Sequence, residues 1–376
     1  MRRSKGPFLL LFLIAIFILP EFGCAQQYPD LEVSPVQVSA ESVSTDFDNP
    51  WSFTFLPGGD LLVTEKEGKM FRLTDGKKTE IQGLPDVYVR GQGGLMDVET
   101  HPDFDNNKLI YFTYGSNTTD DNGGNTTIMR ARLTGDQLEN QEVIFKALPE
   151  SSKGQHWGGR IAFDPDGYLF VSVGDRGARD ENPQSLSNHC GKVHRIFDDG
   201  RIPPDNPFVD QEGAIGSIYS YGHRNPQGMA VHPETGEIWT HEHGPRGGDE
   251  LNLIRKGINY GWPVITYGIN YSGTKITDIT EKEGMAQPVT YWVPSIAPCG
   301  MTFVTSDKYP EWQGSILLGS LKFNYLHRVK LDGNKVVMQE KILDGFGRMR
   351  SVKQGPDGYI YFSVEGKGVF RINPAT

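Results

Sequence analysis

The 376-residue chain has only three cysteines, no basic run and a net charge of −10. Cys190 and Cys299 are the cysteines outside the N-terminal segment, so a disulfide framework does not stabilise this fold. The absence of a basic run argues against a nucleic-acid partner, since no surface is offered to phosphates. Linker-like and low-complexity segments are also missing between Gln27 and Thr376, and we expect a single domain there.

Long apolar runs are scarce as well. Basic residues precede the apolar run Phe8–Leu19, and small residues follow it. This run is too short to cross a bilayer comfortably, so we expect no membrane span. It predicts a secretory signal peptide over residues 1–25 and a mature domain over residues 26–376, in the periplasm or outside the cell. A lipidated Cys24 is the alternative.

What the sequence has in quantity is turn residues, with 45 glycines and 24 prolines, and an internal repeat. The repeated unit is an alternating apolar segment, a proline, a short Gly/Asp/Asn turn and a second apolar segment. Its copies are FTFLPGGDLLVTE from Phe53, VETHPDFDNNKLIYFTY from Val98, IAFDPDGYLFVSVGD from Ile161, MAVHPETGEIWTHE from Met229, a looser MTFVTSDKYPEWQGSILLGS from Met301 and VKQGPDGYIYFSVEG from Val352.

Each copy predicts a β-hairpin, because alternation with a period of two is typical of strands and Asp-Gly pairs favour tight turns. The intervals between hairpins leave room for two more strands each. The pattern therefore predicts an all-β protein, a six-bladed β-propeller. Residues Leu31 to Asp48 also alternate and could complete the last blade, which would remove open sheet edges. A β-sandwich with similar hairpins is the alternative.

Polar segments occur at the same place in several repeats, just before the hairpin begins. Residues at the same phase of several blades project from one end of a propeller towards one point, and site residues concentrate on such loops. We therefore expect a functional site there. The segments are Gly91–Leu95, Gln155–Arg160, Arg224–Gly228, Ser295–Gly300 and Arg348–Arg350.

A further polar segment, Gly222 to Trp262, contains glycines, exposed carbonyls and the adjacent carboxylates of Asp249 and Glu250. Calcium prefers oxygen ligands, so this loop could bind it. A solvated glycine-rich turn is the alternative interpretation. His241 and His243 would share one face of a strand and could ligate a transition metal, but no further ligands present themselves.

The set GQGGL, QHWGGR, GHRNPQG, HGPRGGDELNLIRKGINYGWP, SIAPCG and RMR resembles the soluble aldose sugar dehydrogenases. These are six-bladed propellers that use pyrroloquinoline quinone (PQQ) and calcium. The resemblance extends from about Trp51 to Ile372. It implies oxidation of an aldose at C1 to the lactone, with electrons passed to an external acceptor.

The resemblance also implies roles for individual residues. His156 matches the general base that takes the proton of the C1 hydroxyl while hydride passes to the quinone. PQQ has three carboxylates and an ortho-quinone, which cationic side chains would bind. The positions that match cofactor contacts are Gln92, Arg224, Asn225, Tyr271, Ser295, Lys322, Arg348 and Arg350.

Two calcium ions are implied in the same way. The carbonyls of Gly244 and Pro245 would hold an ion beside PQQ, where it would polarise the quinone. Asp249, Glu250 and Tyr260 match a second, more structural ion, some of whose ligands are main-chain carbonyls.

The sequence departs from the family pattern at several points. Gln155 stands where the best-known glucose-oxidising members have an acid, which puts the orientation and basicity of His156 in question. Cys299 replaces a more usual serine, and we expect both it and Cys190 to be buried thiols. The insertions are short, which favours an open site with broad aldose tolerance. A calcium-dependent propeller hydrolase such as a sugar lactonase, and a non-catalytic secreted propeller, are the rival functions.

Overall fold

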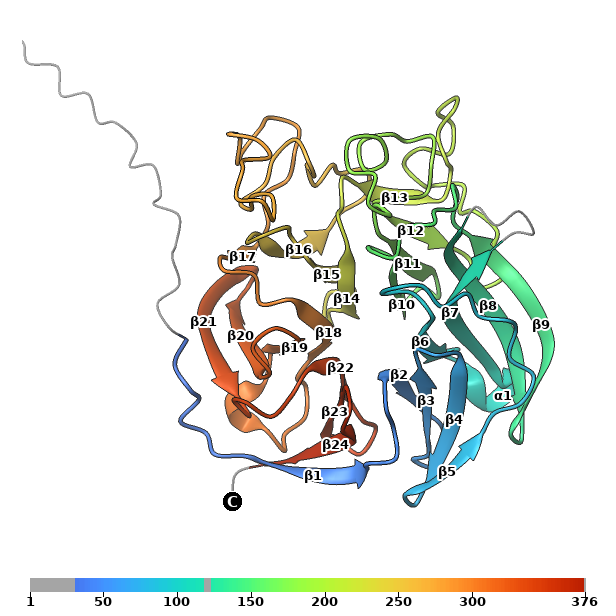
Figure 1. Ribbon diagram of the computed structural model, residues 1–376. Coiled ribbons are helices and arrows are strands. Elements are labelled where there is room, and N and C mark those ends of the chain that lie inside the picture. The colour runs from blue at the N-terminus through green and yellow to red at the C-terminus, as the bar shows by residue number, and fades with distance from the viewer. Residues whose placement is uncertain (1–30, 118–122, 375–376) are drawn as a thin grey trace, which may run out of the picture.

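In the computed structural model, which describes residues 31–117 and 123–374, the strands form six four-stranded antiparallel sheets. Figure 1 shows these sheets arranged as blades around a central axis, in chain order. This confirms the predicted six-bladed propeller. The signal peptide and Cys24 lie outside the described residues.

The first blade consists of β2 (Pro50–Phe55), β3 (Leu61–Glu65), β4 (Lys69–Thr74) and β5 (Lys77–Glu80). The second consists of β6 (Leu95–Thr100), β7 (Leu109–Asn117), β8 (Gly124–Thr134) and β9 (Gln137–Lys146). The third consists of β10 (Gly158–Phe163), β11 (Leu169–Val173), β12 (Lys192–Ile196) and β13 (Ile218–Tyr221).

The fourth blade consists of β14 (Pro226–Val231), β15 (Ile238–Glu242), β16 (Asp249–Ile254) and β17 (Thr290–Trp292). The fifth consists of β18 (Pro298–Phe303), β19 (Ile316–Ser320), β20 (Leu326–Asp332) and β21 (Lys335–Ile342). The sixth combines β22 (Met349–Gln354), β23 (Ile360–Val364) and β24 (Gly368–Asn373) with β1 (Ser39–Ser44) from the start of the chain.

The ring is closed by β1, which pairs with β24 from Ser39 opposite Asn373 to Ser44 opposite Val369. The prediction that the segment before the first repeat completes the last blade is therefore confirmed. The first strand of the chain thus pairs with the last strand, and the two ends of the chain are held together in one blade.

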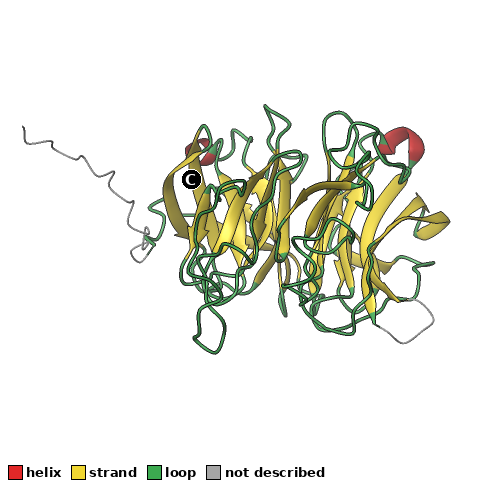
Figure 2. Cartoon of the chain, turned by 90° about the horizontal axis from the view of Figure 1, so that it is seen from above, coloured by secondary structure: helices red, strands yellow, loops and turns green. Residues whose placement is uncertain are grey.

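Each sequence repeat forms the two innermost strands of a blade, as the hairpin prediction requires. Two of the turns differ from the prediction, because they contain short helices: α1 (Phe104–Asn107) and the 3-10 helix η1 (Pro310–Trp312). Figure 2 shows both helices at the same end of the ring. Within the described part of the chain these are the helices, and neither is long enough to span a membrane.

Apolar side chains between neighbouring blades form the core. Tyr111 of the second blade meets Phe163 of the third edge-on, with ring centroids 5.0 Å apart. Trp239 and Phe303 make a similar contact between the fourth and fifth blades at 6.0 Å. Such pairs contribute about 0.5–1.5 kcal/mol beyond the burial of their area. Cys190 and Cys299 are buried free thiols, as expected.

Candidate functional site

The predicted polar segments meet at the end of the ring opposite the two helices, because each precedes the innermost strand of its blade. Two adjoining cavities of about 510 and 790 Å³ occupy this end. Gln92, Pro245 and Tyr271 line both cavities. The smaller also contains His156 and Arg224, and the larger is lined by Gly244, Asp249, Ser295, Lys322, Arg348 and Arg350. The other candidates, Asn225, Glu250 and Tyr260, line neither cavity.

A β-bulge near the start of the innermost strand recurs in every blade. The register shifts lie between Pro50 and Ser52, Leu95 and Val98, Gly158 and Ile161, Pro226 and Gly228, Cys299 and Met301, and Met349 and Ser351. A bulge bends its strand and re-aims the side chain at the bulge. This local feature explains how residues just inside regular strands, such as Arg350, come to line the cavity.

His156 is the centre of the smaller cavity. Its backbone has a φ of 55°, a left-handed conformation that few non-glycine residues adopt. The main-chain N–H of His156 donates to Oε1 of Gln92 at 2.8 Å. Its Nδ1 lies 2.6 Å from Oδ1 of Asp175, and 13% of its side chain remains exposed. A carboxylate partner keeps the proton on Nδ1, which leaves Nε2 as the basic nitrogen.

Asp175 is held as firmly as the histidine. The Gly177 N–H donates to its Oδ1 at 2.7 Å, and Nε1 of Trp262 donates to its Oδ2 at 2.9 Å. Burial acts to raise the pKa of Asp175, but the hydrogen bond and charge of His156 and the charge of Arg224 lower it overall. The carboxylate is therefore ionised at neutral pH.

The pKa of His156 is lowered from its ordinary value. Burial is the main cause, the charges of Arg224 and Arg176 act in the same direction, and the hydrogen bond to Asp175 opposes them. Neutral imidazole, which can accept a proton, is thus the form present at neutral pH. Gln155 takes no part in orienting the ring: it is exposed, and Asp175 holds the histidine instead.

Arg224 and Asn225 contribute buried donors that have no acceptor among the described residues. Nη1 of Arg224 donates to the carbonyl of His243 at 2.9 Å, but its buried Nε has no partner. Oδ1 of Asn225 accepts the Gly158 N–H at 3.1 Å, while its Nδ2 is buried and unpaired. Because unpaired buried donors are costly, these two atoms indicate that a ligand with acceptor oxygens belongs here.

Three further cations line the larger cavity. Arg350 and Arg348 both donate to the carboxylate of Glu365, with Nε of Arg350 at 2.9 Å from Oε1 and Nε of Arg348 at 2.7 Å from Oε2. The side chain of Arg350 is 16% exposed and that of Arg348 is 50% exposed. Lys322 is exposed, with Nζ 4.9 Å above the ring of Phe323.

Tyr271 and Ser295 differ in how firmly they are held. Tyr271 is 75% exposed, so its ring stands free at the mouth of both cavities. The hydroxyl of Ser295 accepts the Gly247 N–H at 3.0 Å and donates to the Pro245 carbonyl at 3.2 Å. Ser295 therefore shapes the Gly244–Gly248 loop.

The Gly244–Pro245 loop is compact. A side chain at Gly244 would place its Cβ 2.1 Å from the Gly248 carbonyl oxygen, so the loop requires glycine there. Asp249 ties it down, because its carboxylate accepts the Gly244 N–H at 2.8 Å and the Ala297 N–H at 2.7 Å. Both carboxylate oxygens of Asp249 are thus engaged, and burial raises its pKa to about 6.

The other residues expected around a second ion lie away from the two cavities. Glu250 is the cross-strand partner of Glu242, and burial followed by the charge of Glu242 raises the pKa of Glu250 to about 8. Oδ1 of Asn252, beside both carboxylates, is buried without a donor. This group of oxygens fits a divalent cation. The hydroxyl of Tyr260 donates to the Leu253 carbonyl and accepts the Arg255 N–H at 2.9 Å, so its main-chain carbonyl is the more available ligand.

His241 and His243 do not form a metal site. Nε2 of His241 lies 3.0 Å from the Gly300 carbonyl, and Nε2 of His243 lies 2.8 Å from the Pro298 carbonyl. Both imidazoles join the fourth blade to the fifth. Within residues 31–117 and 123–374, no group of three or more His, Cys, Asp or Glu side chains could hold a metal, so any calcium here must use main-chain or amide oxygens as well.

Sequence reasoning missed the acids that hold the predicted site residues. Asp175 holds His156, Glu365 holds both Arg348 and Arg350, and Glu242 accepts the main-chain N–H of Arg224. A signal for them was present, because each of these acids ends the second strand of a repeat or lies within two residues of its end.

The fold and site together define a six-bladed propeller with a cationic pocket and a carboxylate–histidine pair at one end. The chain belongs to the glucose/sorbosone dehydrogenase family, whose sequence model matches residues 47–371. The resemblance stated from the motifs is thereby confirmed.

Individual relatives agree with this assignment. The chain is 42% identical to the aldose sugar dehydrogenase YliI of Escherichia coli (strain K12) over 339 residues, which cover 88% of this chain and 91% of the relative. It is similar to the apo-form structure of the soluble aldose sugar dehydrogenase from Escherichia coli, with a TM-score of 0.87, 40% identity and coverage of 90% and 100%. It is also similar to the PQQ-bound aldose sugar dehydrogenase of Streptomyces coelicolor, with a TM-score of 0.73, 29% identity and coverage of 90% and 99%.

Proposed function

We propose that this chain is a PQQ- and calcium-dependent dehydrogenase that oxidises aldoses at C1 to lactones and passes the electrons to an external acceptor. The observation that carries the proposal is the His156–Asp175 pair beside the unpaired donors of Arg224 and Asn225. The family assignment and the PQQ-bound relative support it. A periplasmic or secreted location remains a prediction from the N-terminal residues.

The residues at the two cavities fit PQQ chemically, together with Asn225, which follows Arg224 in the chain but lines neither cavity. The carboxylate and quinone oxygens of PQQ would give acceptors to Nε of Arg224 and Nδ2 of Asn225, which have none from the protein. Arg350, Arg348 and Lys322 would add positive charge on the side of the larger cavity. When bound, PQQ would supply an electrophilic ortho-quinone for the hydride of the sugar.

Calcium would be held at the loop that Asp249 fixes. The Gly244 and Pro245 carbonyls are hard oxygen ligands of the kind calcium prefers. An ion there would act as a Lewis acid beside the cofactor. A second, structural ion would use Glu250 with the Tyr260 carbonyl, and Glu242 and Asn252 would complete its oxygen surroundings.

The chain's own chemistry in this reaction is proton transfer. Nε2 of His156 would accept the proton of the C1 hydroxyl, and Asp175 would stabilise the resulting imidazolium. The nearby Arg224 charge favours neutral imidazole before the transfer. General-base catalysis of this kind contributes about 10²–10⁴-fold to the rate.

The wall of the smaller cavity suits a sugar, because polar side chains predominate in it. Lys153, Gln155, Asp180, Glu181 and Asn270 line it beside His156. Trp262 and Tyr271 add aromatic surface, but the many donors and acceptors favour a hydroxyl-rich ligand over an apolar one. The cavity is open to solvent, as the exposed Tyr271 at its mouth indicates, which supports broad aldose tolerance.

The test is to mix metal-free apo-protein with PQQ and Ca²⁺, record the visible spectrum, and then add an aldose. We expect a cofactor spectrum that requires both additions and is bleached by the sugar. A protein that hydrolyses lactones without PQQ would instead support the hydrolase, and one that does neither would support the non-catalytic propeller. Aldose-dependent dye reduction that persists after chelation and dialysis would refute the proposal.

A further inference from the structure

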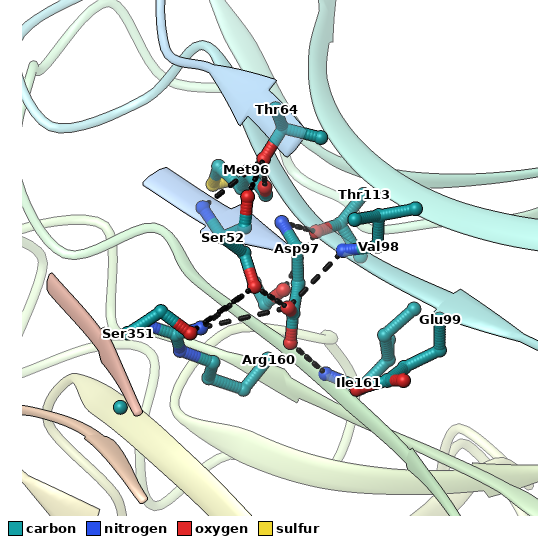
Figure 3. Close-up of polar contacts among 12 residues, drawn as sticks. Ser52, Thr64, Met96, Asp97, Val98, Glu99, Thr113, Arg160, Ile161 and Ser351 are labelled. Carbon is teal, nitrogen blue, oxygen red and sulfur yellow. Dashed lines mark hydrogen bonds and ion pairs between the residues drawn. The ribbon is translucent and has the colours of Figure 1, made fainter. Parts of the chain in front are cut away.

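Arg160 lies on the propeller axis, on the innermost strand of the third blade. The whole residue is 3% exposed. Figure 3 shows its guanidinium among side chains from several blades. Its Nη1 faces the first and second blades, at 3.4 Å from Oγ of Ser52 and 3.5 Å from Oδ1 of Asp97. Trp51 of the first blade packs its ring 4.0 Å from the guanidinium carbon.

The other two nitrogens of Arg160 reach the remaining blades. Nε donates to the Gln227 carbonyl of the fourth blade at 2.8 Å. Nη2 donates to the Arg350 carbonyl of the sixth blade at 2.7 Å, and lies 3.5 Å from Sγ of Cys299 in the fifth. One guanidinium therefore contacts the innermost strands of all five remaining blades. The planar guanidinium has donors in several directions and can make all these contacts at once, whereas the single ammonium of a lysine cannot.

The contact with the sixth blade leads directly to the proposed cofactor site. Arg160 binds the carbonyl of Arg350, whose own guanidinium lines the larger cavity. Sγ of Cys299 lies between the two guanidiniums, at 3.6 Å from Nη1 of Arg350. Arg160 thus binds the main chain of Arg350 directly and reaches its side chain through Cys299, while Glu365 accepts from the same side chain.

Asp97 fixes Arg160 in turn. Its carboxylate accepts Oγ–H of Ser52 at 2.6 Å and the Ile161 N–H at 3.1 Å, as Figure 3 shows. The pair is buried, and Nζ of Lys353 in the sixth blade lies 3.9 Å from the same Oδ1, so loss of Arg160 would leave the Asp97 carboxylate with this more distant cation as its partner.

We propose that Arg160 is a positioning residue for the anion site. Its contacts with the other blades hold its guanidinium in place, the guanidinium in turn holds Arg350, and the position of Arg350 sets the affinity for the cofactor. This inference rests on the proposed function, because it takes Arg350 to bind an anionic group of PQQ. A purely structural Arg160 would affect stability alone.

The experiment compares Arg160→Lys with a matched control, Arg328→Lys. Arg328 is also buried and paired with a carboxylate, but its contacts with Ser315, Glu311 and Glu340 stay within the fifth blade. Full-length mature apo-protein is titrated with PQQ at saturating Ca²⁺, and its melting curve is recorded without either. We expect both variants to lose melting temperature, while only Arg160→Lys raises the Kd for PQQ, by about tenfold or more.

The double variant Arg160→Lys/Arg350→Ala separates positioning from a general loss of fold. If Arg160 acts through Arg350, the Kd of the double variant equals that of Arg350→Ala within about twofold. If the two substitutions instead multiply their separate effects on the Kd, the inference is overturned. An unchanged Kd in Arg160→Lys would overturn it as well. Failure of wild-type protein to bind PQQ would overturn the proposed function and this inference with it.

Should Arg160→Lys fail to fold, Asp97→Asn takes its place. Asp97 faces Nη1 of Arg160, whereas the Arg350 carbonyl accepts from Nη2, and Asp97 lines neither cavity. Its substitution removes the counter-ion of Arg160 but no group near the cofactor. A raised Kd for PQQ that disappears in the Arg350→Ala background would support the proposal, and an unaltered Kd would overturn it.

Discussion

Asp175→Asn is the substitution that most directly examines the proposed base. The Asp175 carboxylate accepts three hydrogen bonds, from His156, Gly177 and Trp262. An asparagine has a single acceptor oxygen, so its amide N–H₂ must face at least one of these donors. If it faces His156, the imidazole is driven to the other tautomer, with its proton on Nε2 and no basic atom for the sugar.

The lost hydrogen bonds set the expected sizes of two effects, the loss of stability and the loss of rate. A buried donor left without an acceptor costs about 1–3 kcal/mol, so the melting temperature should fall but the propeller should remain folded. Activity should fall much further. An equivalent Asp→Asn change in a Ser-His-Asp triad reduces kcat by about 10⁴, and we expect a loss of about 10²–10⁴ here. Affinity for PQQ should change little, because Asp175 contacts none of the cationic residues of the larger cavity.

The pH dependence of the rate provides an independent test, because the direction in which its midpoint shifts can be predicted. The wild-type rate should rise as His156 loses its proton, with a midpoint below the ordinary histidine pKa, because burial lowers that pKa. The hydrogen bond to Asp175 opposes this lowering, so removing the carboxylate should move the midpoint to still lower pH.

The assay is pre-steady-state reduction of bound PQQ by an aldose, measured from about pH 4.5 to 8 in wild type and variant. Glu340→Gln is the matched control, since Glu340 is a buried carboxylate that pairs with Arg328 in the fifth blade. It should lose stability without loss of rate. Near-normal reduction by Asp175→Asn, or a midpoint displaced to higher pH, would refute the assignment of His156 as a base oriented by this carboxylate.

Three other outcomes are expected. Glu250→Gln should abolish much of the rise in melting temperature on adding Ca²⁺, measured by calorimetry; an undiminished rise would place the structural ion elsewhere. Arg179 donates to Oδ1 of Asn270 at 2.7 Å across the smaller cavity, so Arg179→Ala and Asn270→Ala should each raise kcat/KM for a disaccharide relative to glucose, and the double variant no further. Arg350→Ala should weaken PQQ binding by about 1.5–3 kcal/mol, and Arg348→Ala, at a more exposed position, by under about 1 kcal/mol. A larger loss of affinity in Arg348→Ala than in Arg350→Ala, measured by titration, would contradict this.

The fold could be predicted because its information is local and repeated. A hairpin such as Ile161–Asp175 has an alternating apolar pattern on both sides of an Asp-Gly turn, and these features act over a few residues. The helices in the second and fifth repeats were missed, since Phe104 and Trp312 lie in longer turns where their burial against the blades determines the conformation. Tertiary burial of that kind has no signature in a single short segment.

The site was predicted in part for a related reason. His156 and Arg224 each lie two residues before the innermost strand of their blade, and Arg350 is the second residue of its own, so their convergence at one end followed from the propeller alone. The identity of their partners did not. Asp249 was expected as an ion ligand, but its carboxylate caps the N–H groups of Gly244 and Ala297, which depends on the path of two loops.

The missed acids nevertheless follow one rule. In an antiparallel hairpin, the start of the first strand lies beside the end of the second. Glu65, Asp175, Glu242 and Glu365 each end the second strand of a repeat or lie within two residues of its end.

Each of these acids holds residues at or just before the start of the first strand of its own blade. Glu65 accepts main-chain N–H groups and so shapes a loop, while Glu242 accepts the Arg224 N–H and also pairs with the buried His223 side chain. Asp175 and Glu365 bind the side chains of His156 and Arg350 and so prepare a base and an anion site. The carboxylate is the same in all four blades. What differs is which donor the preceding loop presents, and this depends on loop length and on the bulge that follows. A repeat pattern can therefore locate such an acid in the sequence, but only the folded loop assigns it to structure or to chemistry.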